Sequence, residues 1–250
     1  MKPPEVLYKY TTLRTMDRIE EIVVGNRIFF CSPYDFNDPF DCRPRITIGR
    51  TETEQKAARR WIEAALVKRL GLDRTARRIQ ARETLKKLEG NDDITDYYKA
   101  LLGRAGVYCV SARNDHLLMW SHYSASHTGA CLAYSTTNND FFSRAAKVHY
   151  QSSYPIVKLF QQKEDWGQQS MLTKSDLWAY EEEWRLTSKE PGHLDIPSNA
   201  LVAIILGCKV TEKDKNAILE LRSRSGRAIN LVQAKMKSRE YGIQFSDVDA

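Results

Sequence analysis

Three carboxylates and one guanidinium lie within the ten residues 177–186, Leu-Trp-Ala-Tyr-Glu-Glu-Glu-Trp-Arg-Leu. If this stretch is a β-strand, successive side chains point to opposite faces. Glu181, Glu183 and Arg185 then share one face, and the opposite face is mostly aromatic. Two carboxylates that lie this close raise each other's pKa unless a cation intervenes, and groups held in this way often line clefts.

A helix is the alternative conformation for the same ten residues. Glu181 and Arg185 would then form an i,i+4 ion pair on a solvated face, which contributes about 0.2–0.5 kcal/mol. The aromatic content and the alternation favour the strand. In either conformation, the Glu pair is the first candidate for a catalytic site, and a purely structural role is the other interpretation.

The loop that follows Ser32-Pro33 is a second candidate site. Asn37, Asp38 and Asp41 are short polar residues among turn-forming ones, and Pro39 fixes its own φ angle. Such side chains hydrogen-bond the neighbouring backbone, so a well-ordered structural turn is one interpretation. A ligand-binding loop is the other.

The bulk composition limits the class of protein. No apolar run approaches the roughly 18 residues that span a bilayer, and the N-terminus has no hydrophobic signal region, so we expect a cytoplasmic protein without a membrane anchor. The five cysteines are scattered and form no Cys-x-x-Cys pair. We therefore expect neither a disulfide framework nor a cysteine-bound zinc site.

The positive charge is concentrated in one segment. The net charge of the chain is +6, whereas residues 43–90 contain fourteen Lys or Arg and six Asp or Glu, which gives +8. The segment is predicted to be helical and to form part of an insertion at about residues 43–105. It is either a solvated charged face or a surface that binds nucleic acid or another polyanion.

The remaining pattern predicts a single α+β domain over residues 1–250 with a mostly antiparallel sheet, because the strands are not regularly separated by crossover helices. The strands are expected at 7–11, 27–31, 106–111, 130–134, 200–207, 228–234 and 241–245. The helices are expected at 13–24, 51–89, 94–102, 117–123 and 212–223, with a short helix or loop at 156–162. Gly71 is expected to interrupt the region 51–89, which then continues over 74–88.

Several motifs resemble a bacterial family that is known only as a domain of unknown function. The resemblance extends from about residue 6 to residue 245 and implies a bacterial or phage origin without supplying an activity. The motifs are Leu7-Tyr8-Lys9-Tyr10, Phe30–Pro33 with Phe36–Asp41, Tyr108–Ser111, Met119–Tyr123 with His127-x-Gly129, and Lys174–Arg185.

The order of these parts also resembles the ADP-ribosyltransferase superfamily. Its members have an early strand with a polar ligand for NAD, a central strand that ends in a small hydroxyl residue, and a late catalytic Glu. This resemblance implies Glu183 and Glu181 as catalytic residues. It implies NAD-binding roles for Lys9, Tyr10, Ser111, Trp120, Tyr123 and Arg185. The early strand departs from the pattern, because it contains Lys9 between two tyrosines where His or Arg is expected.

Three functions remain as alternatives. The first is cleavage of the nicotinamide–ribose bond of NAD with transfer to nucleic acid or protein, in a role such as bacterial defence. The second is metal-dependent binding or hydrolysis of nucleic acid, with Asp38, Asp41 and the Glu pair as ligands. The third is a non-catalytic module in which a buried polar network, made of Asn37, Asp41, Glu181, Glu183 and Arg185, fixes the sheet.

Overall fold

The computed structural model describes residues 1–250 except 48–50, 71–72, 89–101, 159–165 and 249–250. The chain divides into two compact units, each assembled from segments that are separate in the sequence. Unit 1 comprises Met1–Ser32, Ala105–Val148 and Leu177–Ala250. Unit 2 comprises Pro33–Arg104 and His149–Asp176, so it contains nearly all of the predicted insertion.

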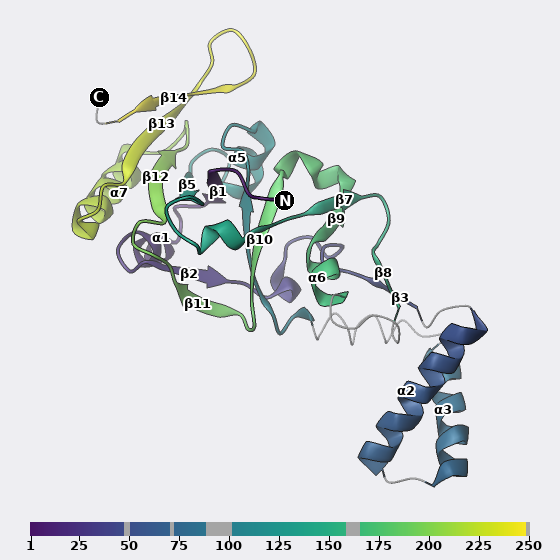
Figure 1. Ribbon diagram of the computed structural model, residues 1–250. Helices are drawn as coiled ribbons and strands as arrows, with labels where there is room; N and C mark the ends of the chain where they lie inside the picture. Colours follow the sequence, from purple (N-terminus) through teal and green to yellow (C-terminus); the bar gives the residue numbers. More distant parts are fainter. Residues whose placement is uncertain (48–50, 71–72, 89–101, 159–165, 249–250) are drawn as a thin grey trace. The chain divides into compact units, whose positions relative to one another are not determined.

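Unit 1 is built on a sheet that has eight strands among the described residues, in the order β14-β13-β12-β5-β1-β4-β10-β6 (Figure 1). The β12–β13 pair is parallel, and the other neighbours are antiparallel. The predicted α+β class with a mostly antiparallel sheet is confirmed. The strands are β1 (Val6–Thr11), β4 (Gly106–Ser111), β5 (Ala130–Ser135), β6 (Ala146–Lys147), β10 (Glu183–Ser188), β12 (Leu201–Leu206), β13 (Asn230–Met236) and β14 (Ile243–Asp247).

The other elements of unit 1 surround this sheet. A two-stranded ribbon pairs β2 with β11. Helix α7 begins where the Thr211 hydroxyl accepts a hydrogen bond from the Asp214 N–H, and it ends at Gly226 with φ 63°. The bounds are α1 (Met16–Val23), β2 (Arg27–Phe30), α5 (Leu117–Tyr123), η2 (Phe142–Arg144), η3 (Asp176–Glu181), β11 (Gly192–Asp195) and α7 (Glu212–Ser225).

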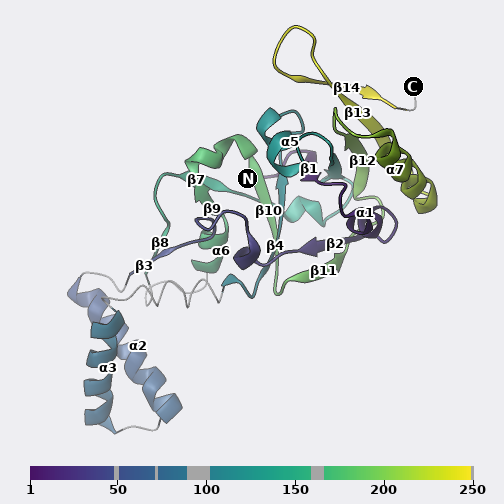
Figure 2. The same ribbon diagram turned by 180° about the vertical axis from the view of Figure 1, so that it is seen from behind.

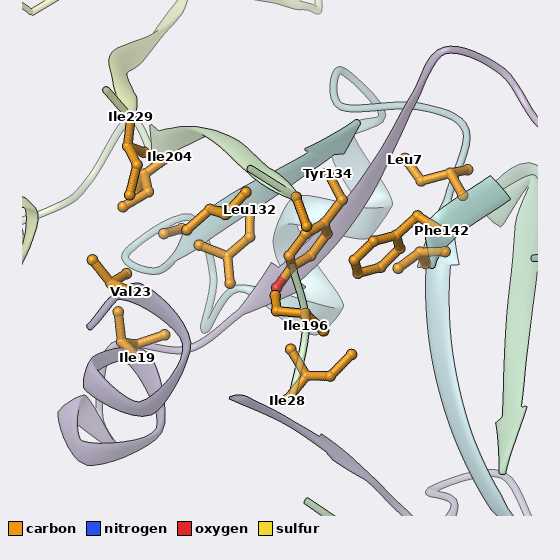
Figure 3. Packing of buried hydrophobic residues seen from close by; sticks show 14 of the residues in the cluster. Leu7, Ile19, Val23, Ile28, Leu132, Tyr134, Phe142, Ile196, Ile204 and Ile229 are labelled. Atoms are coloured by element: carbon orange, nitrogen blue, oxygen red, sulfur yellow. The ribbon is translucent and has the colours of Figure 1, made fainter. Parts of the chain in front are cut away.

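The sheet buries both faces, but against different partners. We call the first the core face. It carries Leu7, Leu132 and Tyr134, which belong to one buried cluster with Ile19 and Val23 of α1 (Figure 3). We call the second the α5 face, where Tyr10, Cys131 and Ile205 pack against Met119 and Trp120 of α5. Because side chains alternate along a strand, every sheet residue can be assigned to one of these faces.

Unit 2 contains short paired strands and a helical hairpin. Strand β3 pairs with β8, and β7 pairs with β9, in each case parallel. Helices α2 and α3 lie in the predicted helical region 51–89, and α3 covers Arg74–Leu88 as expected. The bounds are η1 (Pro33–Asp35), β3 (Arg45–Thr47), α2 (Glu52–Leu70), α3 (Arg74–Leu88), β7 (His149–Gln151), β8 (Ile156–Lys158), α6 (Trp166–Met171) and β9 (Thr173–Ser175).

Two local predictions need correction, and a third cannot be compared with the structure. The helix expected at 13–24 begins only at Met16. The segment 156–162, expected as helix or loop, begins with strand β8, and its residues from 159 onward lie outside the described part. The helix expected at 94–102 falls almost entirely on residues that are not described. No helix in the described part of the chain is long and apolar enough to cross a membrane.

The stretch 177–186 is only half a strand. Residues up to Glu181 form the 3₁₀ helix η3, Glu182 adopts a left-handed φ of 44°, and β10 begins at Glu183. A 3₁₀ helix repeats every three residues, so the predicted alternation fails before Glu183. It holds afterwards, because Trp184 and Leu186 lie on the core face, which places Glu183 and Arg185 on the α5 face.

Candidate functional site

Three neighbouring strands bring together segments that are distant in the sequence. In the middle strand, β4, Ser111 is the last residue, and it is paired with Tyr8 of β1 and with Glu183 of β10. Residues directly opposite one another in neighbouring strands share a face. Tyr8, Ser111 and Glu183 therefore form a row across the α5 face, at the point where the chain leaves β4 and enters β10.

The Glu183 carboxylate is held by a buried guanidinium. Arg185 donates from Nε to Oε1 at 2.8 Å and from its terminal Nη2 to Oε2 at 3.0 Å. Glu183 is 4 % exposed and Arg185 is 1 % exposed. This bidentate geometry fixes the orientation of the carboxylate, and the opposite charges offset each other where water is excluded.

A second carboxylate lies at the same turn. Glu181 is buried, and its Oε1 accepts a hydrogen bond of 2.6 Å from the Tyr123 hydroxyl. The carbonyl of Glu181 accepts another from the Ser111 hydroxyl at 2.6 Å. The turn before β10 is thus attached both to α5 and to the end of β4.

Burial and a neighbouring charge also raise the pKa of a cysteine thiol on β4. Cys109 lies opposite Arg185, so it shares the α5 face with Glu183. Burial raises the pKa of the Cys109 thiol well above its usual value, and the negative charge of Glu183 raises it further. Cys109 is therefore an uncharged neighbour of the ion pair rather than a nucleophile.

Several side chains that were predicted to bind NAD form hydrogen bonds with the backbone of the loop that follows β4. The Tyr10 hydroxyl donates to the Arg113 carbonyl at 3.0 Å, and the Trp120 indole N–H donates to the Asn114 carbonyl at 2.7 Å. The Ser111 hydroxyl also accepts the Arg113 N–H. These contacts position the loop 111–114. Trp120 is 0 % exposed, and its ring packs edge-on against Tyr10, so it has no free face for a ligand.

Lys9 does not join this group. Alternation places it on the core face with Leu7, and its Nζ lies 4.9 Å from the centre of the Tyr108 ring. On β1, the aromatic residues that share a face with Glu183 are Tyr8 and Tyr10. Sequence reasoning overlooked Tyr8, although its position two residues before Tyr10 placed both on one face.

Tyr8 also lines a groove on the α5 face. The groove has a volume of about 440 Å³, and Asn114, Ala133, Ala203 and Phe245 contribute to its lining. Ala133 and Ala203 are paired across β5 and β12, and their small side chains leave the space. Burial raises the pKa of Tyr8, so its hydroxyl is protonated. A volume of this size is typical of a pocket for a small organic ligand.

The predicted site loop belongs to unit 2, so its placement is described within that unit alone. Asp41 is buried and lies 3.7 Å from the Nζ of Lys174, and its Oδ1 accepts the Cys42 N–H. Asp38 accepts the Phe40 N–H, as in an ordinary turn. Asn37 is exposed. Among the described residues, no group of three or more His, Cys, Asp or Glu is arranged to hold a metal ion.

Comparison with family models gives a match over part of the chain. A model of a family described as "Protein of unknown function (DUF2971)" matches residues 119–186. The match runs from α5 to β10 and includes Trp120, Tyr123, Glu181, Glu183 and Arg185. The resemblance to a family of unknown function is thus confirmed for this part of the chain, and the motifs before residue 119 lie outside it. Comparisons with curated proteins and with solved structures give no match.

Proposed function

We propose that the chain cleaves the nicotinamide–ribose bond of NAD and transfers the ADP-ribosyl group, with Glu183 as the catalytic carboxylate. The observation that supports this most is the row Tyr8–Ser111–Glu183 on three neighbouring strands. The resemblance to ADP-ribosyltransferases requires an early strand, a strand ending in a small hydroxyl residue and a late Glu. Here those three parts lie side by side although Ser111 and Glu183 are far apart in the sequence.

The chemistry requires a fixed negative charge beside the ribose. Departure of nicotinamide leaves positive charge on the ribose, and a preorganised carboxylate stabilises that charge without reorganisation. The Glu183 carboxylate is preorganised by its two hydrogen bonds from Arg185. Ser111 and Tyr123 act as positioning residues, because they attach the turn that carries the Glu pair to β4 and α5.

The groove beside Tyr8 offers space for part of the substrate. It lies on the same face as Glu183 and is lined mainly by apolar residues, together with Tyr8, Asn114, Ser246 and Asp247. A planar ring could contact Tyr8 and Phe245 there. Lys9, which points to the other face, has no part in this proposal.

A second candidate function is a non-catalytic module in which the Glu pair is structural. The near-complete burial of Glu183 and Arg185 favours this candidate, because a fully paired buried network can serve to fix one arrangement of the strands. In the first candidate Glu183 takes part in the cleavage of NAD, whereas in the second it has no role in NAD chemistry.

An assay of nicotinamide release from NAD distinguishes the two candidate functions. The assay compares the wild-type protein with Glu183→Gln, which keeps the shape of the side chain and one acceptor oxygen. Glu182→Gln is the control, because Glu182 is an exposed neighbour of the same charge. We expect Glu183→Gln to lower the rate by about 10²–10³-fold, as when one electrostatic group is removed from a catalytic site.

The fold of each variant is checked by circular dichroism and thermal unfolding. A folded Glu183→Gln protein that releases nicotinamide at the wild-type rate would contradict the proposal. So would a wild-type protein that releases none at saturating NAD. Either result would favour the structural candidate.

A further inference from the structure

Helices α2 and α3 of unit 2 form a hairpin that is held together by few apolar residues. Ala58 and Ile62 of α2 are buried, as are Ala81 and Leu85 of α3, at the i,i+4 spacing that places each pair on one helix face. Figures 1 and 2 show the two helices lying along each other. Among the side chains of the hairpin that are described, the buried apolar ones lie on this narrow face, so the outer surfaces of both helices can carry charge.

The outer surface of α3 is strongly basic. By sequence, Arg74–Leu88 contains six Lys or Arg and a single acidic residue, Glu83, which gives +5. Four of the cations recur at every fourth position. We call Arg74, Arg78, Arg82 and Lys86 the α3 cationic row, and all four are exposed. At a rise of 1.5 Å per residue, the row extends about 18 Å along the helix.

The α3 cationic row is not neutralised within the described part of the chain. None of its members forms an ion pair or side-chain hydrogen bond there. Neighbouring cations do so, since Lys56 pairs with Glu52 at 2.7 Å and the Nε of Arg77 donates to the Asp73 carbonyl. Cations at i,i+4 repel one another weakly. A row of them on one helix therefore favours a polyanion.

We propose that the α3 cationic row binds the phosphate backbone of duplex nucleic acid. Phosphates of one strand advance about 3.4 Å along a DNA duplex, so an 18 Å row spans about five of them. Guanidinium groups suit this role because they recognise phosphate oxygens bidentately. The contact would be independent of base sequence, since it involves no base edges.

The rest of the hairpin argues against two other partners. Single-stranded nucleic acid requires aromatic side chains on which bases stack, and the row contains none. A membrane surface requires a continuous apolar face, whereas the large apolar side chains that are exposed on the described part of this hairpin are Trp61 of α2 and Ile79 of α3. The inference does not rest on the NAD chemistry proposed above.

The test is fluorescence anisotropy with labelled 20-base-pair duplexes, one of DNA and one of RNA, between 50 and 200 mM salt. The row variant is Arg78→Gln/Arg82→Gln/Lys86→Gln. The control variant, Lys213→Gln/Lys235→Gln/Arg239→Gln, removes the same charge from exposed positions of unit 1. Loss of three phosphate contacts lowers the slope of log K against log salt by about 2.7. We expect the row variant to bind at least about tenfold more weakly at 100 mM salt, and the control to bind like the wild type.

Several results would overturn the inference. They are absence of wild-type binding to both duplexes at 50 mM salt, equal weakening in the two triple variants, and tighter binding to single-stranded DNA or anionic phospholipid vesicles than to duplex. The Glu183→Gln protein should bind duplex like the wild type. This measurement shows whether the proposed duplex binding by the α3 cationic row fails independently of the proposed NAD chemistry.

Discussion

Two regions of the molecule differ in the burial and pairing of their charged side chains. One is the place where β4 ends and β10 begins, and the other is the outer surface of α3. At the first, Glu183 and Arg185 are buried and paired with each other, and Glu181 accepts a hydrogen bond from Tyr123. On α3, the cationic row is exposed and unpaired within the described residues. A buried charge must be paired because desolvation is costly, whereas an exposed one remains solvated until a partner arrives. Paired buried charges therefore suit fixed geometry, and unpaired exposed ones suit association.

The largest expected effect comes from breaking the buried pair. Arg185→Met removes the guanidinium and leaves the Glu183 carboxylate buried without it, so we expect a loss of about 3–5 kcal/mol in the free energy of unfolding. Urea denaturation measures it. Arg224→Met is the control, because Arg224 forms an exposed ion pair with Glu20, and such pairs contribute about 0–1 kcal/mol. Equal losses in the two variants would show that burial does not distinguish the two ion pairs.

A smaller effect is expected at the second carboxylate. Tyr123→Phe removes the hydroxyl that donates to Glu181 and leaves a buried acceptor with one partner fewer. We expect the free energy of unfolding to fall by about 1–3 kcal/mol. Tyr241→Phe is the matched control, because Tyr241 is fully exposed. An unchanged denaturation midpoint for Tyr123→Phe would show that this hydrogen bond does not stabilise the turn before β10.

The stability of unit 1 should also depend on pH through two histidines near α5. Burial lowers the pKa of His116 and of His127 below the usual 6.5, with further lowering by the charges of Arg113 and Lys209 respectively. The unfolded chain then binds more protons than the folded chain as the pH falls through about 6.5. Stability is therefore complete above that value and declines below it.

The double variant His116→Asn/His127→Asn tests this dependence. Asn suits both positions, since His116 precedes α5 as its N-cap and His127 has a left-handed φ of 69°. The urea midpoint of the wild type should fall between pH 7.5 and 5.5, and the fall should be smaller in the double variant. His149→Asn, at an exposed position, should leave the fall unchanged. The same fall in all three proteins would assign the pH dependence to other groups.

The smallest effect on stability is expected for the row variant of α3. Its three substituted side chains are exposed and form no ion pair in the described part of the chain, so the free energy of unfolding should change by less than about 0.5 kcal/mol. Thermal and urea unfolding measure it. A stability loss as large as that of Arg185→Met would show that the row packs against the protein, which would remove the contrast between the two regions.

Local pattern in the sequence was sufficient for several features. The apolar runs at 106–111, 130–134 and 200–207 predicted β4, β5 and β12, and Thr211 marked the start of α7. Alternation from residue 183 onward correctly separated Glu183 and Arg185 from Trp184 and Leu186. The positive charge of 43–90 is a property of composition alone. These features depend on residues a few positions apart, so periodicity and capping chemistry reveal them.

Only the tertiary structure decided which of these elements meet. Cross-strand pairing placed Ser111 beside Glu183 and Tyr8 beside Ser111, and it placed Lys9 on the opposite face from all three. The chain also turns at Glu182, so only the second half of the expected strand, from Glu183 onward, is extended. The physical reason is that a strand's neighbours are chosen by which apolar faces bury each other over the whole sheet. Residues far apart in the sequence take part in that choice, and local spacing carries no record of it.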